Sequence, residues 1–137
     1  MKKGIPLKWR RPHTLYEVVN SARNTGEIGL NLAEFLDHVN LLARKTTGRR
    51  ALHTGIRVEP PPTGHAVQDA YLAAVAAHLA RKHRLPLPRW TEKKSRHLDR
   101  PWFALNDDWA KAGLLRDSPA AFRERNLFTD ENALHRA

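Results

Sequence analysis

The chain has 137 residues, of which 41% are hydrophobic and 28% charged, and its formal net charge is +10. This length predicts one domain, and this composition argues against a wholly disordered chain. The absence of cysteine excludes a disulfide framework, a thiol nucleophile and a cysteine-ligated zinc site. We also expect a cytoplasmic protein, because no apolar run has the roughly 18–20 residues of a membrane span and the N-terminus lacks a signal-peptide core.

The first 13 residues, MKKGIPLKWRRPH, are predicted to form a basic arm in front of a single helical domain over 14–137. The arm carries five basic residues and no acidic one. Its cations can neutralise phosphates, and its tryptophan can stack on a base or enter a pocket of a protein partner. The alternative is a solvated terminus with no ligand. The candidate binding residues here are Lys8, Trp9, Arg10 and Arg11.

Two helices are predicted after the arm. Thr14 and Glu17 form a capping-box pattern, in which a hydroxyl and a carboxylate satisfy backbone N–H groups at a helix start. Asn31 and Glu34 repeat this pattern after the glycine-containing stretch NTGEIG, which we expect to be flexible. Apolar residues with helical spacing follow both signals. The predicted helices cover about 14–23 and, ending near Lys45, about 31–45.

Residues 45–63 are predicted to be a connector loop. The stretch TTGRRALHTGIRVEPPPTG contains three glycines and a triple proline, which favour turns and extended backbone. At most a short strand is expected around 56–58. Arg49, Arg50 and Arg57 make the connector strongly basic, so we include them among the candidate nucleic-acid or partner-binding residues.

The clearest predicted element is the helix AVQDAYLAAVAAHLARKH at 66–83, which combines an apolar stripe with many alanines. Pro86 and Pro88 should end it, and LPLPRW should continue as extended chain. The large aromatic side chains that follow are expected to line the core. They are Trp90, Trp102, Phe103 and Trp109.

Residues 81–100 form a third basic segment, with eight basic and two acidic side chains. Lys93, Lys94 and Arg96 are its candidate binding residues. The arm, the connector and this segment could together make one binding groove, but their convergence depends on the fold.

The closing stretch SPAAFRERNLFTDENALHRA predicts two short helices joined by NLF. Ser118 before Pro119 is a favoured helix start, Asn126 suits a left-handed stop, and Thr129 can cap a terminal helix. We expect this pair to pack on the core. The alternative is a DNA-reading helix-turn-helix, whose last helix would offer few polar side chains to the bases. The side chains expected to pack are Phe122, Leu127, Phe128 and Leu134, and those available to bases are Asn132, His135 and Arg136.

The predicted fold class is therefore mainly α: a small helical bundle with a proline-rich connector and a C-terminal pair of short helices. We predict no metal site, because His78 and His83 are five residues apart and no H-E-x-x-H pattern occurs. No cofactor is expected. His97 beside Asp99 and Arg100 would suit proton transfer and phosphate stabilisation in a metal-independent ribonuclease, although an ordinary surface histidine is the simpler interpretation.

Three stretches taken together resemble a group of small bacterial proteins, common in actinobacteria. They are EPPPTGHAVQDAYLAAVAAHLARKHRLPLPRW, HLDRPWFA and DSPAAFRERNLFTDENALHRA, which span roughly residues 59–137. The basic start and the residues LNDDWAKAG depart from the usual pattern of that group. The resemblance implies an antitoxin-like or regulatory protein whose partner is a toxin or a nucleotidyltransferase-like protein. It assigns no catalytic residues.

The sequence thus favours a non-enzymatic interaction protein that binds an acidic protein or nucleic acid through its basic segments. Two alternatives stay open: a DNA-binding transcriptional regulator that uses the C-terminal pair, and a small basic ribonuclease.

Overall fold

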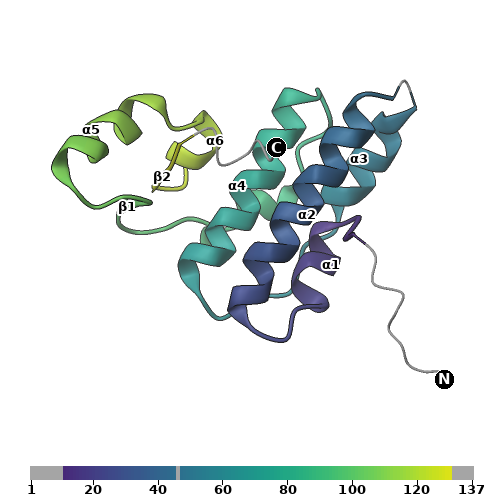
Figure 1. Cartoon of the computed structure of the whole chain (residues 1–137), viewed down its shortest axis with the longest axis horizontal. Coiled ribbons are helices and arrows are strands. Elements are labelled where there is room, and N and C mark those ends of the chain that lie inside the picture. The colour runs from purple at the N-terminus through teal and green to yellow at the C-terminus, as the bar shows by residue number, and fades with distance from the viewer. Residues whose placement is uncertain (1–10, 46, 131–137) are drawn as a thin grey trace.

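The computed structural model describes residues 11–45 and 47–130, and these residues form a mainly helical fold as predicted (Figure 1). Helix α4 lies at the centre, with α1, α2 and α3 on one side and the C-terminal elements on the other. No described helix is both long and apolar enough to cross a membrane. The helices are α1 Leu15–Asn20, α2 Thr25–Ala43, α3 Gly48–Arg57, α4 Ala66–Lys82, α5 Asp108–Asp117 and α6 Ala120–Arg123; the 3-10 turns are η2 Arg89–Glu92 and η3 Lys94–Arg96; the strands are β1 Trp102–Phe103 and β2 Leu127–Phe128.

Helix α1 begins at the predicted cap. The Glu17 N–H donates to Thr14 Oγ1 at 3.0 Å, and the Glu17 carboxylate accepts from the His13 N–H at 3.2 Å. These two bonds satisfy backbone donors at the helix start. Leu15 and Val18 are fully buried, which fixes α1 against α2.

Helix α2 starts earlier than the sequence indicated. Asn24 is its cap, with Oδ1 accepting from the Glu27 N–H at 3.0 Å, so the supposedly flexible NTGEIG stretch forms the cap and first turns. The prediction that Asn31 starts this helix was wrong. Asn31 lies inside α2, where Nδ2 donates to the Val18 carbonyl at 3.1 Å and ties α2 to α1. The same N-x-x-E pattern occurs twice, and the first copy is the cap.

The predicted connector loop contains helix α3. The glycines that suggested a loop are instead sites of close packing, because a Cβ on Gly48 would lie 2.0 Å from the Leu42 carbonyl oxygen. A Cβ on Gly55 would lie 3.0 Å from the His13 carbonyl oxygen and 3.2 Å from the Phe35 ring. The absent side chains let α3 approach its neighbours closely while Leu52 and Ile56 enter the core.

Helix α4 occupies the predicted range and is buried on nearly every side. Six consecutive residues, Leu72 to Ala77, are at most 1% exposed. Small alanine side chains allow neighbouring elements to approach on several faces at once, which is why the helix can be central rather than amphipathic. It ends where Arg84 adopts φ +56°, and the Leu85 N–H donates to the Ala80 carbonyl at 2.8 Å.

The C-terminal region differs from the predicted helical pair. Helix α6 is followed by strand β2, which pairs in parallel with β1 so that Trp102 lies opposite Leu127. Asn126, just before β2, adopts the predicted left-handed conformation with φ +63°. The terminal helix predicted after Thr129, with Asn132, Leu134, His135 and Arg136, falls almost entirely outside the described residues.

Ser118 does not cap α6 as predicted. The cap residue is Pro119, and the buried Ser118 hydroxyl instead accepts from the Thr129 N–H at 2.9 Å. This bond ties the chain after β2 to the end of α5. Phe122 and Leu127 are fully buried, as expected of core residues in this stretch, and Phe128 is half-buried.

Helix α5 was not predicted and lies away from the central helices (Figure 1). Its cap is Asp107, whose Oδ1 accepts from the Ala110 N–H at 2.8 Å. The expectation that Trp109 lines the core was wrong, because its side chain is 89% exposed on this helix. Trp90, by contrast, is buried as expected.

Candidate functional site

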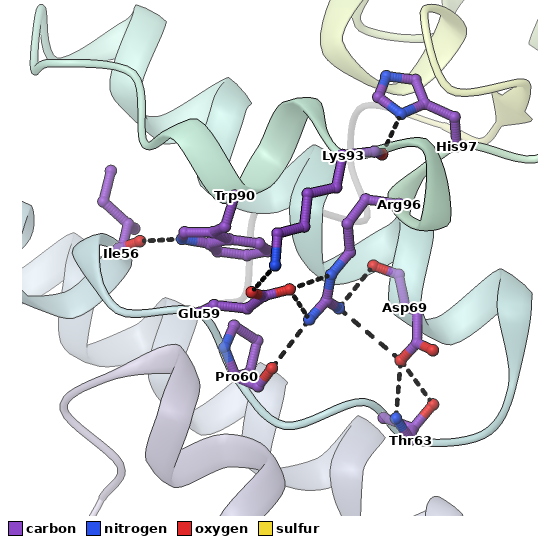
Figure 2. Close-up of polar contacts among 9 residues, drawn as sticks. All are labelled: Ile56, Glu59, Pro60, Thr63, Asp69, Trp90, Lys93, Arg96 and His97. Atoms are coloured by element: carbon purple, nitrogen blue, oxygen red, sulfur yellow. Dashed lines mark hydrogen bonds and ion pairs between the residues drawn. The ribbon is translucent and has the colours of Figure 1, made fainter.

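Arg96, one of the predicted ligand contacts, points into the protein (Figure 2). Its side chain is 2% exposed, and its guanidinium donates to Glu59 Oε2 at 3.0 and 3.2 Å and to the Pro60 carbonyl at 2.8 Å. It also donates to the Asp69 carbonyl at 3.1 Å and lies 5.0 Å from the Trp90 ring centroid. Arg96 therefore binds the proline-rich segment to the start of α4 and has no surface left for a ligand.

Lys93 takes part in the same cluster. Its Nζ lies 2.6 Å from Glu59 Oε1, so Glu59 links Lys93, which lies between the two 3-10 turns, to Arg96 in η3 (Figure 2). Burial alone would raise the pKa of Glu59, but the hydrogen bonds from Lys93 and Arg96 outweigh it and the pKa lies below its ordinary value. Lys94 is exposed next to this cluster.

Arg125, which was not among the predicted binding residues, has a similar internal role. Its side chain is fully buried and donates to the Ala121 and Thr91 carbonyls at 2.8 and 2.9 Å. The same guanidinium contacts Glu92 Oε2 at 2.8 Å. Arg125 thus joins α6 to η2, and its charge is used within the fold.

The arginines of α3 lie on the surface. With about 3.6 residues per turn, positions 49, 50, 53, 54 and 57 share one side of a helix, and positions 48, 52, 55 and 56 share the opposite side. The second set is buried and packs on α1, α2 and α4. The first set faces outward, and it contains Arg49, Arg50, His53, Thr54 and Arg57.

The chain after α4 runs alongside α3 in the same direction. At the start of α3, the Arg49 guanidinium donates to the His83 carbonyl at 2.6 Å and to the Arg84 carbonyl. At the end of α3, the Ile56 carbonyl accepts from Trp90 Nε1 at 3.0 Å. These contacts bring two basic segments that are far apart in the sequence onto one surface.

We call this surface the basic face. None of its basic side chains forms a salt bridge with an acidic side chain of the described residues, and the stretches 44–57 and 82–89 contain no acid. Several other basic side chains of the described residues are paired, such as Arg81 with Glu124 at 2.7 Å. An excess of unpaired cations gives the surface a positive potential. The name covers the exposed basic residues of these two segments, which are Arg44, Lys45, Arg49, Arg50, Arg57, Lys82, Arg84 and Arg89.

Two hollows lie in the basic face. The first hollow, of about 350 Å³, lies between α3 and the chain that follows α4. The second hollow, of about 420 Å³, lies between α3 and the start of α1, where the imidazole rings of His13 and His38 stack at 4.0 Å. Thr47 and Arg50 line both hollows. The remaining lining residues are Arg49, His53, Leu85 and Pro86 in the first, and His13, Thr14, His38, Ala51 and Thr54 in the second.

The basic segments considered for a joint groove converge only in part. The structure brings Arg49, Arg50 and Arg57 together with the first part of the basic segment 81–100, whereas Lys93 and Arg96 turn toward Glu59. Arg11 pairs with Glu34 at 3.2 Å, near the second hollow, and Lys8, Trp9 and Arg10 lie outside the described residues.

Sequence analysis had not selected the other five members of the basic face. The signal that could have found them is the lack of acids in the stretches 44–57 and 82–89. The five are Arg44, Lys45, Lys82, Arg84 and Arg89.

His97 is held by its own segment. Its Nδ1 lies 2.8 Å from the Lys93 carbonyl oxygen, a bond that needs a proton on Nδ1 and fixes the ring against η3 (Figure 2). Asp99 and Arg100 are exposed on the following bend. Among the described residues, no group of three histidine, cysteine or acidic side chains is gathered for a metal ion.

No protein-family model, curated protein or solved structure matches this chain. What can be assigned is the class that fold and surface define: a small, mainly helical domain that carries an unpaired basic face beside α3.

Proposed function

We propose that the protein is a non-enzymatic nucleic-acid-binding protein whose basic face contacts the phosphate backbone. The observation that supports this proposal is the set of eight exposed cations with no acidic partner, gathered from two segments. Neutralising phosphates with such groups releases condensed counterions, which is the main source of affinity in sequence-independent binding. Guanidinium and ammonium groups stay protonated at neutral pH, so they suit charge recognition rather than proton transfer.

The basic face also supports α3, rather than the C-terminal pair, as the element that contacts nucleic acid. Helix α6 has four residues and leads into a strand, and Arg125 beside it is buried. The exposed side of α3, by contrast, carries three arginines over ten residues.

The test is a binding titration with fluorescently labelled nucleic acid, repeated at several salt concentrations. We expect the logarithm of the binding constant to fall linearly with the logarithm of salt, with a slope of about −0.7 per contacted phosphate for a single strand and about −0.9 for a duplex. The double variant Arg50→Gln and Arg57→Gln should weaken binding and reduce the slope.

A matched control is Arg116→Gln with Arg123→Gln, which removes the same charge from α5 and α6. It should leave most of the affinity intact. Binding that ignores salt, or that falls equally in both double variants, would contradict a role for the basic face.

A second candidate function follows from an apolar groove of about 540 Å³ between α2 and α4. Its lining includes Ile28, Leu32 and Val67, and such a groove suits the apolar side of a partner protein. This observation favours the antitoxin-like or regulatory role that the family resemblance implies. Affinity capture from the source cells should then recover one stoichiometric protein that survives nuclease and is lost with Val67→Asp.

A further inference from the structure

We infer that the basic face binds single-stranded rather than double-stranded nucleic acid, with unstacked bases entering the two hollows on either side of Arg50. This inference rests on the proposed function and specifies its ligand. Both hollows fall within the range of about 300–1,000 Å³ that small-molecule sites occupy. Because Thr47 and Arg50 line both, the hollows are neighbours separated by a single cation.

The linings suit bases as well as phosphates. In the first hollow, Leu85 and Pro86 provide an apolar wall next to the guanidinium groups of Arg49 and Arg50. Bases bind by lying flat on apolar and aromatic surfaces or on arginine planes. Arg49 is already fixed by the His83 and Arg84 carbonyls, so its plane is held in place before a ligand arrives.

In the second hollow, the stacked imidazoles of His13 and His38 supply aromatic surface, with an angle of 4° between the rings. Thr14 and Thr54 line the same hollow. The Thr14 hydroxyl accepts from the Glu17 N–H and keeps its proton for a base edge, whereas the Thr54 hydroxyl donates to the Arg50 carbonyl and can only accept from one. Arg50, between the hollows, is placed to neutralise the phosphate that joins two consecutive nucleotides.

A duplex cannot use this arrangement. Its bases are stacked and paired, so a protein reaches only their edges, through side chains that project into a groove. The stacked and paired bases of a regular duplex cannot enter a hollow in the protein surface, whereas a single strand can turn its bases outward into it. Stacking contacts are worth about 1–3 kcal/mol per base, or roughly 5- to 150-fold in affinity.

The test compares three probes with the same phosphates per strand: a 12-nucleotide thymidine strand, its duplex with oligoadenine, and a 12-unit abasic strand. We expect the thymidine strand to bind at least about fivefold more tightly than either of the others, as expected for one stacked base. His38→Ala should weaken binding of the thymidine strand and leave the affinity for the abasic strand unchanged. His65→Ala, which removes an exposed imidazole outside both hollows, is the matched control.

The possible results distinguish the single-strand inference from the phosphate-binding function on which it rests. Equal or tighter binding of the duplex or of the abasic strand overturns the single-strand inference while leaving the phosphate-binding function in place. Failure of all three probes to bind in a salt-dependent manner overturns the proposed function itself. The comparison of probes uses the unmodified protein, so it stays decisive even where His38→Ala disturbs folding.

Discussion

The protein uses arginine in two opposite ways. Arg96 and Arg125 are buried, and each joins segments distant in the sequence through several carbonyl and carboxylate oxygens. Arg50 and Arg57 are exposed, and no described acidic side chain pairs with either. The high positive charge of this chain therefore does not act as a single property. Part of it pairs with oxygen atoms inside the fold, and part of it lies on the surface without an acidic partner among the described residues.

The two sets differ in what surrounds them. A guanidinium has five N–H donors, and burial without partners would cost several kcal/mol. The buried arginines lie where backbone carbonyls and an acidic side chain converge. The arginines of α3 lie in a stretch without acids, so the water-facing orientation is the favourable one.

Replacing Arg125 should have the largest effect on stability. Arg125→Met keeps much of the volume but leaves the Thr91 and Ala121 carbonyls without donors, so we expect a loss of about 2–4 kcal/mol in the free energy of unfolding. Chemical denaturation measures this loss. Arg123→Met, at an exposed position on α6 two residues before Arg125, should change stability by less than about 0.5 kcal/mol. Equal effects of the two variants would contradict the structural role of Arg125.

The attachment of α3 can be broken at one glycine. Gly48→Ala places a Cβ 2.0 Å from the Leu42 carbonyl oxygen, so α3 must move, and we expect a loss of about 1–3 kcal/mol. Gly29→Ala in α2 is the control, because nothing lies within 4 Å of the added Cβ. It should stabilise the protein by up to about 1 kcal/mol through helix propensity. Thermal unfolding of both variants would distinguish a packed helix from a connector loop.

Stability should depend on pH through Glu59. Its pKa is lower in the folded protein than the ordinary value of 4.5, so its stabilising contribution is present above that value and is lost as pH falls through the folded-state pKa. Glu59→Gln should therefore cost about 1–2 kcal/mol at pH 7 and progressively less below about pH 4. A difference from the unmodified protein that stays constant between pH 7 and pH 3 would argue against the link to Lys93 and Arg96.

The smallest stability effect is expected on the basic face. Arg57→Gln should change the free energy of unfolding by less than about 0.5 kcal/mol, because the side chain is exposed and unpaired. Its effect should instead be on ligand binding, where removing one phosphate contact lowers the salt slope by about 1. Together with Arg125→Met, this variant separates the charge that stabilises the fold from the charge proposed to bind nucleic acid.

Local signals in the sequence predicted several elements correctly. The cap at Thr14, the helix over 66–83 and the left-handed Asn126 each depend on neighbouring residues, and each is present. The loop prediction for 45–63 failed because glycine has two uses, in flexible turns and at close contacts. Only the neighbouring backbone of Leu42 and His13 distinguishes them.

The helical class, the central alanine-rich helix and the three basic segments could be predicted from the sequence alone. Propensity, caps and net charge are properties of short stretches, so they can be read without the fold. Which basic residues lie together on the surface could not be predicted, because it depends on how distant segments pack. Arg96 and Arg50 have the same side chain in different surroundings. Arg96 is surrounded by Glu59 and Asp69, whereas Arg50 lies where α3 meets the chain from 83 to 90. Burial and pairing arise between residues distant in the chain, and they determine whether a charge is held inside the fold or stays exposed on its surface.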